Sequence, residues 1–281
     1  MKKLMFIMMA AAAISLVSCK KENANNVDKS DTVTWGGVTY KTVKLKDGRT
    51  WMAEPLRYVP KGKTASENPN DGSGFWYPYS SDGTNCTPLK DKASIKALGY
   101  LYDYETAFGA KISEDNFKSF EGKQGICPDG WHIPTRAELI ALCGSSVKGA
   151  DDAAAIKDEK AAYYDKDYNG AKIAYLNADN FNWSFSGTVS KNSKLKKGSY
   201  QKVITSKTNC SVDDFLGKNA LTYLMGSTGD SVVKYAIGDV NYKFFGLMST
   251  FTLAKYPEGR LSVAFANYKG GFSVRCVKNL K

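Results

Sequence analysis

The sequence predicts an α+β domain with short antiparallel strands and a few helices. Residues from Val38 to Glu54 largely alternate between apolar and polar side chains, a pattern typical of half-buried strands. A capped helix follows Thr135, and roughly the last eighty residues are short β-like runs separated by Gly, Asp and Pro. Helices in the middle of the chain and strands toward both ends indicate the α+β class.

The chain begins with a predicted secretory signal peptide. Lys2 and Lys3 precede an apolar run from Leu4 to Val17, which is shorter than the roughly 20 residues of a membrane-spanning helix. The letters LVSC, which end at Cys19, match the bacterial lipoprotein signal. In that signal, residues 1–18 are removed and the cysteine receives acyl chains such as palmitate. We therefore expect a lipid anchor on Cys19, in the outer membrane, on its periplasmic or surface face. The alternative is an ordinary signal peptide with a chance cysteine.

Residues 19–34 are polar and lack a hydrophobic period, so we expect a flexible tether between the lipid and a folded domain at residues 35–281. The formal net charge of the chain is +11, which favours acidic partners such as anionic polysaccharide or lipid. Nucleic acid is disfavoured as a partner, because the signal peptide directs the protein out of the cytoplasm.

Three segments between the tether and the final strands have recognisable patterns. Asp47-Gly48 indicates a two-residue hairpin turn, since this pair supplies the positive backbone dihedrals that such turns need. The stretch 55–89 is rich in Gly, Pro, Asn and Ser, and loops of this length are usually functional or disordered. YLYDYETAFGA begins an amphipathic helix or its approach, and residues 145–179 suggest one or two short helices.

A helix with clear end signals lies in CPDGWHIPTRAELIALCG. Thr135 and Glu138 form a predicted capping box, in which the Thr hydroxyl accepts from the Glu amide and the carboxylate accepts from the Thr amide. Gly144 follows the last apolar residue and favours a left-handed C-terminal cap. We therefore interpret this stretch as architecture.

The same stretch contains the only histidine of the chain, His132. Trp131 and Ile133 are expected to face inward, which leaves His132 on the opposite side of a short extended run. One histidine and no Cys-x-x-Cys pair exclude a His-rich zinc site. A single histidine suffices as the base for a cysteine nucleophile, Cys127 or Cys143, yet the cysteines of an exported protein are expected to be oxidised. We therefore expect no catalytic residue, and a His132 that bonds the local backbone or packs on the loop.

Five stretches together resemble a known family. In chain order they are DGRTWMAEPLRY, GYLYDYETA, CPDGWHIPTRAELIAL, YLMGST and GGFSVRCVKN. They resemble the Fibrobacter succinogenes major paralogous domain, which occurs in exported proteins and lipoproteins of Bacteroidetes. Relative to a compact version of that domain, residues near 145–207 are an insertion. The family has no established activity to transfer to this chain.

The helix start WHIPT and the final RC strand are also similar to the wider C-type-lectin-like fold, which includes formylglycine-generating enzymes. This resemblance implies a mixed domain whose two ends meet in a small antiparallel sheet, and it places Cys127 near Cys276 as a disulfide. The calcium-dependent sugar motif of C-type lectins and the copper-binding cysteine pair of those enzymes are absent, so no metal or cofactor is carried over. Cys143 is expected to stay unpaired. Whether Cys86 and Cys210 meet stays open.

The leading functional hypothesis is a non-catalytic, lipid-anchored cell-envelope protein whose long loops bind glycan, matrix or another protein. GSGFWYPYS supplies four aromatic side chains for stacking on sugar rings, namely Phe75, Trp76, Tyr77 and Tyr79. The alternative role for such dense aromatics is to bury the loop against its own domain. Two other functions stay open: an enzyme that processes envelope or host glycan with paired carboxylates, and a structural subunit that pairs through exposed strand edges.

Overall fold

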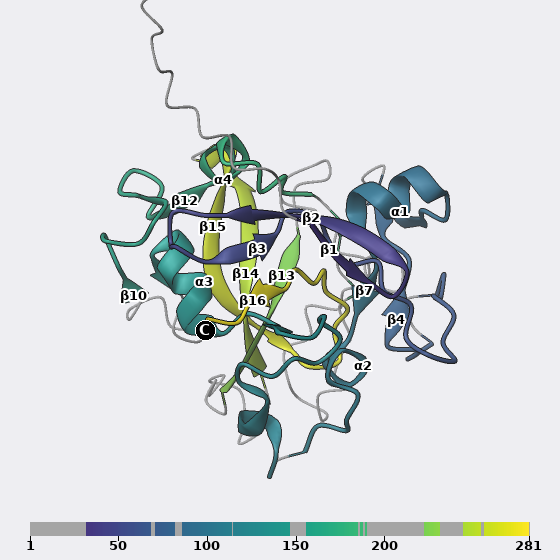
Figure 1. The fold of residues 1–281 in the computed structure, drawn as a ribbon. Helices are drawn as coiled ribbons and strands as arrows, with labels where there is room; N and C mark the ends of the chain where they lie inside the picture. Colours follow the sequence, from purple (N-terminus) through teal and green to yellow (C-terminus); the bar gives the residue numbers. More distant parts are fainter. Residues whose placement is uncertain are drawn as a thin grey trace, which may run out of the picture.

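Figure 1 presents the computed structural model, which describes residues 32–280 apart from 69–70, 82–85, 114, 147–155, 185, 188, 190–221, 231–243 and 254–255. In the described residues, short helices surround a five-stranded sheet, a seven-stranded sheet and two two-stranded sheets. The strand pairs are almost all antiparallel, so the predicted α+β class is confirmed. None of the described helices is both long enough and apolar enough to cross a bilayer.

The five-stranded sheet joins the two ends of the domain. In spatial order its strands are β1 (Thr32–Trp35), β2 (Val38–Lys44), β3 (Thr50–Met52), β16 (Val277–Lys278) and β8 (Trp131–His132). β16 pairs with β3 on one side and with β8 on the other, and both pairs are antiparallel. The two ends of the domain therefore meet in one small sheet, as the similarity to the wider C-type-lectin-like fold implied.

The β2–β3 hairpin turns where the sequence predicted, but its loop is longer than the two residues expected. The amide of Leu45 donates to the carbonyl of Arg49 at 3.0 Å, so the loop runs from Lys46 to Gly48. Gly48 alone has a positive φ there, +79°. Asp47 instead accepts the Arg49 amide on Oδ1 at 3.0 Å, which stabilises a loop with one left-handed residue.

The seven-stranded sheet contains the longest strands. They are β13 (Tyr223–Asp230), β14 (Phe244–Leu253) and β15 (Tyr256–Asn267), with β9 (Ser145–Ser146), β10 (Ile156–Lys157), β11 (Tyr164–Asp165) and β12 (Gly170–Lys172). The C-terminal strands were predicted, although the run VVKYAIG at 232–238 lies outside the described residues. The strands between 145 and 172 were not predicted, because they form by pairing: β12 bonds to the distant β15, which outweighs local helix propensity.

The stretch 55–89, predicted to be irregular, contains short strands. β4 (Phe75–Trp76) pairs with β7 (Leu101–Tyr102), and β5 (Tyr79–Ser81) pairs with β6 (Cys86–Pro88). Strands of two or three residues leave too little alternation in a sequence for periodicity to reveal them.

The described helices are all short. They are α1 (Lys92–Leu98), α2 (Tyr104–Phe108), the 3₁₀ helix η1 (Phe117–Phe120), α3 (Arg136–Cys143) and α4 (Ile173–Ala178). α2 lies in the predicted segment YLYDYETAFGA, and α4 is one helix of the one or two expected in 145–179. α3 has the predicted capping box between Thr135 and Glu138, and Gly144 ends it with φ +69°.

The five-stranded sheet has an apolar core on each face. Val43, Trp51, Val277 and His132 lie opposite one another across neighbouring strands and therefore share one face. On that face, Trp51 and Val277 pack with the buried side of α3. Met52, Trp131 and Cys276 belong to the second core, on the other face. The sheet thus separates two hydrophobic clusters, and this explains why strands with few residues are so rich in buried side chains.

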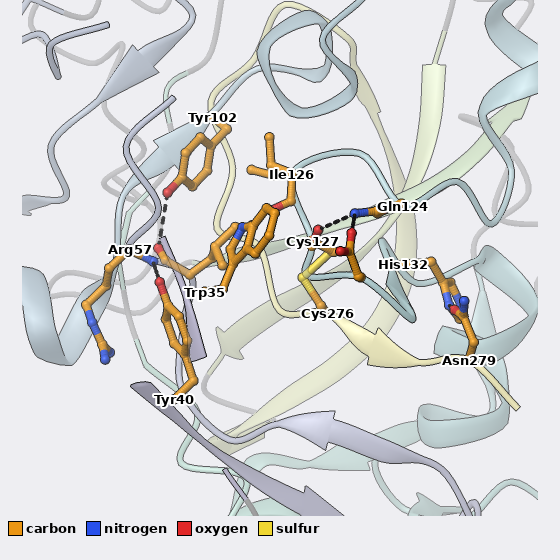
Figure 2. The surroundings of a disulfide bond; sticks show 12 residues. Trp35, Tyr40, Arg57, Tyr102, Gln124, Ile126, Cys127, His132, Cys276 and Asn279 are labelled. Carbon is orange, nitrogen blue, oxygen red and sulfur yellow. Dashed lines mark hydrogen bonds between the residues drawn. A yellow bond between two sulfur atoms is a disulfide. The ribbon is translucent and has the colours of Figure 1, made fainter. Parts of the chain in front are cut away.

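One disulfide crosses the second core. Cys127 and Cys276 are bonded, with Cα atoms 5.8 Å apart and a sequence separation of 149, as the resemblance implied. Figure 2 shows the bond near Trp35 and Ile126. Cys143 is a buried free thiol, as expected, and burial raises its pKa to about 11. Cys19, Cys210 and the side chain of Cys86 lie outside the described residues.

Candidate functional site

Glu138, in the first turn of α3, gathers hydrogen bonds from three elements. Its Oε2 accepts from the Thr135 amide at 2.8 Å, from the Thr135 hydroxyl at 3.0 Å and from His132 Nε2 at 2.9 Å. Its Oε1 accepts from Nε of Arg49, in the β2–β3 loop, at 3.1 Å. Burial raises the pKa of Glu138, but the bonds from His132 and Thr135 outweigh burial and lower this pKa to about 2. The carboxylate therefore stays charged and ties the hairpin, β8 and α3 together.

His132 lies between Glu138 and Asn279. Its Nδ1 is 2.7 Å from Oδ1 of Asn279, just beyond β16, and Figure 2 shows the ring against that side chain. Burial lowers the pKa of His132, yet the bonds to Glu138 and Asn279 and the charge of Glu138 raise it overall above 6.5. Both ring nitrogens face an oxygen acceptor, which suits the imidazolium form.

The N-terminus of α3 also receives a cap from a distant strand. The amide of Arg136, the first residue of the helix, donates to Thr228 Oγ1 of β13 at 2.8 Å. Ser227 beside it donates its amide to the carbonyl of Pro134 at 2.7 Å and accepts the Gly122 amide on Oγ at 2.9 Å. The motif YLMGST thus serves to hold the helix start, and these two hydroxyls are already occupied by the protein.

The arrangement around His132 supports a structural role for this residue. A general base needs a ring nitrogen with a lone pair directed at its substrate, whereas both nitrogens of His132 contact protein oxygens. The two cysteines considered as nucleophiles are also engaged: Cys127 is in the disulfide, and Cys143 is buried with Sγ donating to the Leu139 carbonyl at 3.2 Å. Across the described part of the chain, no three His, Cys, Asp or Glu side chains gather as a metal site would require.

Three of the four aromatic residues expected to stack on sugar are buried, which corrects that expectation. The exposed fractions of Phe75, Trp76 and Tyr79 are 1%, 1% and 5%. Trp76 Nε1 donates to the Asn68 carbonyl at 3.1 Å, and the Tyr79 hydroxyl donates to the Glu67 carbonyl at 3.2 Å. These rings hold the 55–89 segment against its own domain. Because their faces are covered by the protein, they are not available to stack on a ligand.

The fourth aromatic residue, Tyr77, is half-buried and is paired with a residue that the sequence did not single out. Its ring centroid is 5.9 Å from that of Tyr100, which is also half-buried. Tyr100 in turn makes an edge contact with Phe75, with ring centroids 4.9 Å apart. Residues 75 and 77 lie on the same side of the extended segment, whereas Trp76 points to the other side. Only the antiparallel pairing of β4 with β7 places Tyr100 beside them, and that pairing joins distant segments.

A charged pair lies at the side of the two tyrosines. Lys90 Nζ is 2.9 Å from Glu67 Oε1, and both side chains are more than half exposed. The bond to Glu67, and in a smaller part the neighbouring Tyr77, raise the pKa of Lys90. The 55–89 segment therefore contributes one tyrosine ring and one carboxylate to a patch that is completed by a cation and a second tyrosine ring from the residues after it. We call these four residues, Glu67, Tyr77, Lys90 and Tyr100, the tyrosine patch.

Comparison with known proteins places most of the chain in one family. The family model described as the Fibrobacter succinogenes major domain matches residues 47–278. This match begins in the β2–β3 loop and covers β3, the capped helix α3, the disulfide and β16. No curated protein and no solved structure matches the chain.

Proposed function

The chain belongs to the family of the Fibrobacter succinogenes major domain, and on this premise we propose that it is a non-catalytic, lipid-anchored protein of the cell envelope that binds glycan. The tyrosine patch carries this proposal. Tyrosine combines an apolar ring with a polar tip, which suits contact with a sugar ring that has an apolar C–H face and hydroxyl edges. Lys90 and Glu67 supply a donor and acceptors beside the rings, in keeping with sites that use a few placed polar groups.

The segment that contributes Glu67 and Tyr77 to the patch is ordered before any ligand arrives. Trp76 and Tyr79 are buried and hydrogen-bonded to the carbonyls of residues 68 and 67. Tyr77 lies between these two anchors, so its backbone is fixed. Binding to a surface that is already ordered avoids the entropic cost of ordering a loop, which supports a recognition role.

The N-terminal anchor and the finer fold belong to the same proposal. Cys19, with the LVSC signal before it, carries the lipid, and residues 19–34 form the tether to β1. Several acyl chains on one residue hold a protein at the membrane more firmly than one chain does. We further assign the domain to the C-type-lectin-like class, because β3 near its beginning and β16 near its end lie side by side and a disulfide joins Cys276 to the segment before β8.

The binding test uses the mature lipoprotein in detergent on an array of envelope and host polysaccharides. Tyr77→Ala and Tyr100→Ala are each expected to weaken binding at least about tenfold, since each removes a buried contact face worth roughly 1.5 kcal/mol or more. Tyr77→Phe keeps the ring and retains most of the affinity. Tyr175→Ala on α4 is the matched control, because Tyr175 is 41% exposed and lies in another element. Equal binding by the wild type and both alanine variants would refute the proposal.

The anchor is tested separately by Cys19→Ala. The variant is expected to move from the membrane fraction to the soluble fraction. A high-salt wash removes attachment that depends only on the basic charge of the chain. A Cys19→Ala protein that stays on membranes after this wash would contradict the lipid anchor without affecting the binding test.

A further inference from the structure

His132 joins three elements that are far apart in the chain. Its strand, β8, pairs with β16; its Nε2 contacts Glu138 of α3; and its Nδ1 contacts Asn279, the residue after β16. Only 11% of its side chain is exposed. The ring is therefore enclosed between two oxygen acceptors and cannot replace either of them with water without moving.

The protonation state of the ring decides whether both contacts are favourable. The imidazolium donates from both nitrogens, to the Glu138 carboxylate and to the Asn279 carboxamide oxygen. A neutral ring keeps one donor, which the carboxylate takes. The lone pair left on Nδ1 then faces Oδ1 of Asn279 at 2.7 Å, so the carboxamide must withdraw or turn over. After turning over it donates from Nδ2 to Nδ1 in a bond between neutral groups, which is weaker than the bond from the imidazolium.

The charged groups around the ring favour the proton. Glu138 contacts it from α3, whereas Arg49 of the β2–β3 loop opposes it and is itself bonded to Glu138. Asp47, in the same loop, accepts from the Arg49 amide and from Trp51 Nε1 at 3.0 Å. Lys278 of β16 pairs with Trp131 and so lies on the other face of the sheet from His132.

We propose that His132 is a pH-sensitive clasp, whose deprotonation weakens its hold on Asn279 and Glu138 and loosens the C-terminal segment Val277–Leu280 from β8 and α3. The disulfide sets the limit of this opening, because Cys276 is covalently fixed to Cys127. Beyond it, β16 is two residues long, and the amide of Asn279 donates to the Gly130 carbonyl at 2.9 Å. The segment can therefore loosen while the rest of the domain keeps its structure.

The direction of the effect follows from the raised pKa of His132. Its contribution to stability is complete below pH 6.5, the reference value for histidine, and is lost as the pH rises through the higher folded-state pKa. Glu138 sets the opposite limit: its contribution is complete above 4.5 and is lost as the pH falls toward about 2. The clasp is thus closed in mildly acidic solution and opens toward alkaline pH.

Because His132 is the only histidine, one NMR signal reports its titration in the full mature chain. We expect a midpoint above pH 6.5, the reference value for this group. Hydrogen exchange of the Asn279 amide, corrected for the intrinsic pH dependence, is expected to accelerate by about tenfold for each unit by which the pKa is raised. The control is the amide of Met52, which donates to the Cys276 carbonyl at 2.9 Å. Because the disulfide fixes Cys276, this amide is expected to keep its protection at all pH values tested.

Two variants separate the clasp from general destabilisation. His132→Gln has a fixed donor and acceptor, so the corrected exchange of Asn279 becomes independent of pH. Asn279→Asp places a second carboxylate at the ring and moves the midpoint of opening up by about one pH unit, even if His132→Gln fails to fold. A His132 midpoint at or below 6.5, or Asn279 exchange that does not follow the titration, would overturn the proposal.

Discussion

Arg275 places a guanidinium group in the interior, where backbone carbonyls accept most of its hydrogen bonds. One nitrogen donates to the carbonyls of Ala53, at 2.9 Å, and Phe181; the other donates to the carbonyl of Asn182 at 2.5 Å and to Ser184 Oγ at 3.3 Å. Burial lowers the pKa of Arg275 to about 9, so the group stays charged at neutral pH. The planar fork of arginine suits several carbonyls at fixed positions, and it joins the last part of the chain to residues 181–184.

We predict that Arg275→Met destabilises the domain by about 2–4 kcal/mol, because buried carbonyl oxygens lose their donors. Arg275→Lys is expected to recover little of this loss, since an ammonium group cannot reach the same set of acceptors. Denaturant unfolding measures the difference. Lys96→Met, an exposed site on α1, controls for the loss of a positive charge. An Arg275→Met protein as stable as this control would contradict the assigned role.

At the scale of single residues, the sequence predicts hydrogen-bond partners that are close in the chain but not those that are far apart. The capping box of Thr135 and Glu138 was predictable, because its two residues are three positions apart and both bonds are local. The other donors to Glu138 were not, since Arg49 is 89 positions away. The expected sugar-stacking residues failed for the same reason: composition identified the rings of Phe75 and Trp76, but burial depends on pairing with β7.

Several distant parts of the chain contact α3. Its first amide donates to Thr228 of β13, its capping carboxylate contacts Arg49 and His132, and its buried side packs with Trp51 and Val277. Four of the five stretches that resemble the family therefore meet at this helix, and GYLYDYETA is not one of them. Motifs far apart in the chain therefore share one structural role, which is to hold the start of α3.

We predict that Thr228→Val costs about 1–2 kcal/mol, because the methyl group keeps the shape but removes the acceptor for the Arg136 amide. Denaturant unfolding should show a lower midpoint with an unchanged m-value, since the surface exposed on unfolding stays the same. Thr64→Val, at an exposed position, is the matched control. Equal effects of the two substitutions would mean that the second cap does not stabilise α3.

A helix or turn could be predicted where the residues of that segment alone contain the signal for it. The end caps of α3 and the Asp47-Gly48 turn have such signals, and both occur where predicted. β9 to β12 have none, because their pairing partners, such as β15, lie about a hundred residues away or require a turn that the sequence does not mark. The inserted middle was therefore assigned only helices, of which α4 is present.

At the scale of the whole molecule, the five-stranded sheet makes the two ends of the domain interdependent. β16 is only two residues long, yet it lies between β3 and β8 and separates the two cores. Such a short strand contributes few ladder bonds, so its position depends on the groups that flank it. On one side these are Cys276 and its disulfide, and on the other Asn279 and the His132 clasp.

We predict that the double variant Cys127→Ala/Cys276→Ala loses about 4 kcal/mol of stability, the amount that the chain-entropy model assigns to a closure of this length; measured losses are often smaller. The denaturant m-value separates the crosslink from mere burial. Truncating two buried thiols would lower the midpoint alone, whereas loss of a crosslink between residues separated by 149 positions expands the unfolded chain and raises the m-value. Non-reducing peptide mapping of the wild type tests the bond directly. Recovery of Cys127 and Cys276 as separately alkylated peptides would show that the disulfide does not form. It would also contradict the fixed end that limits opening of the clasp.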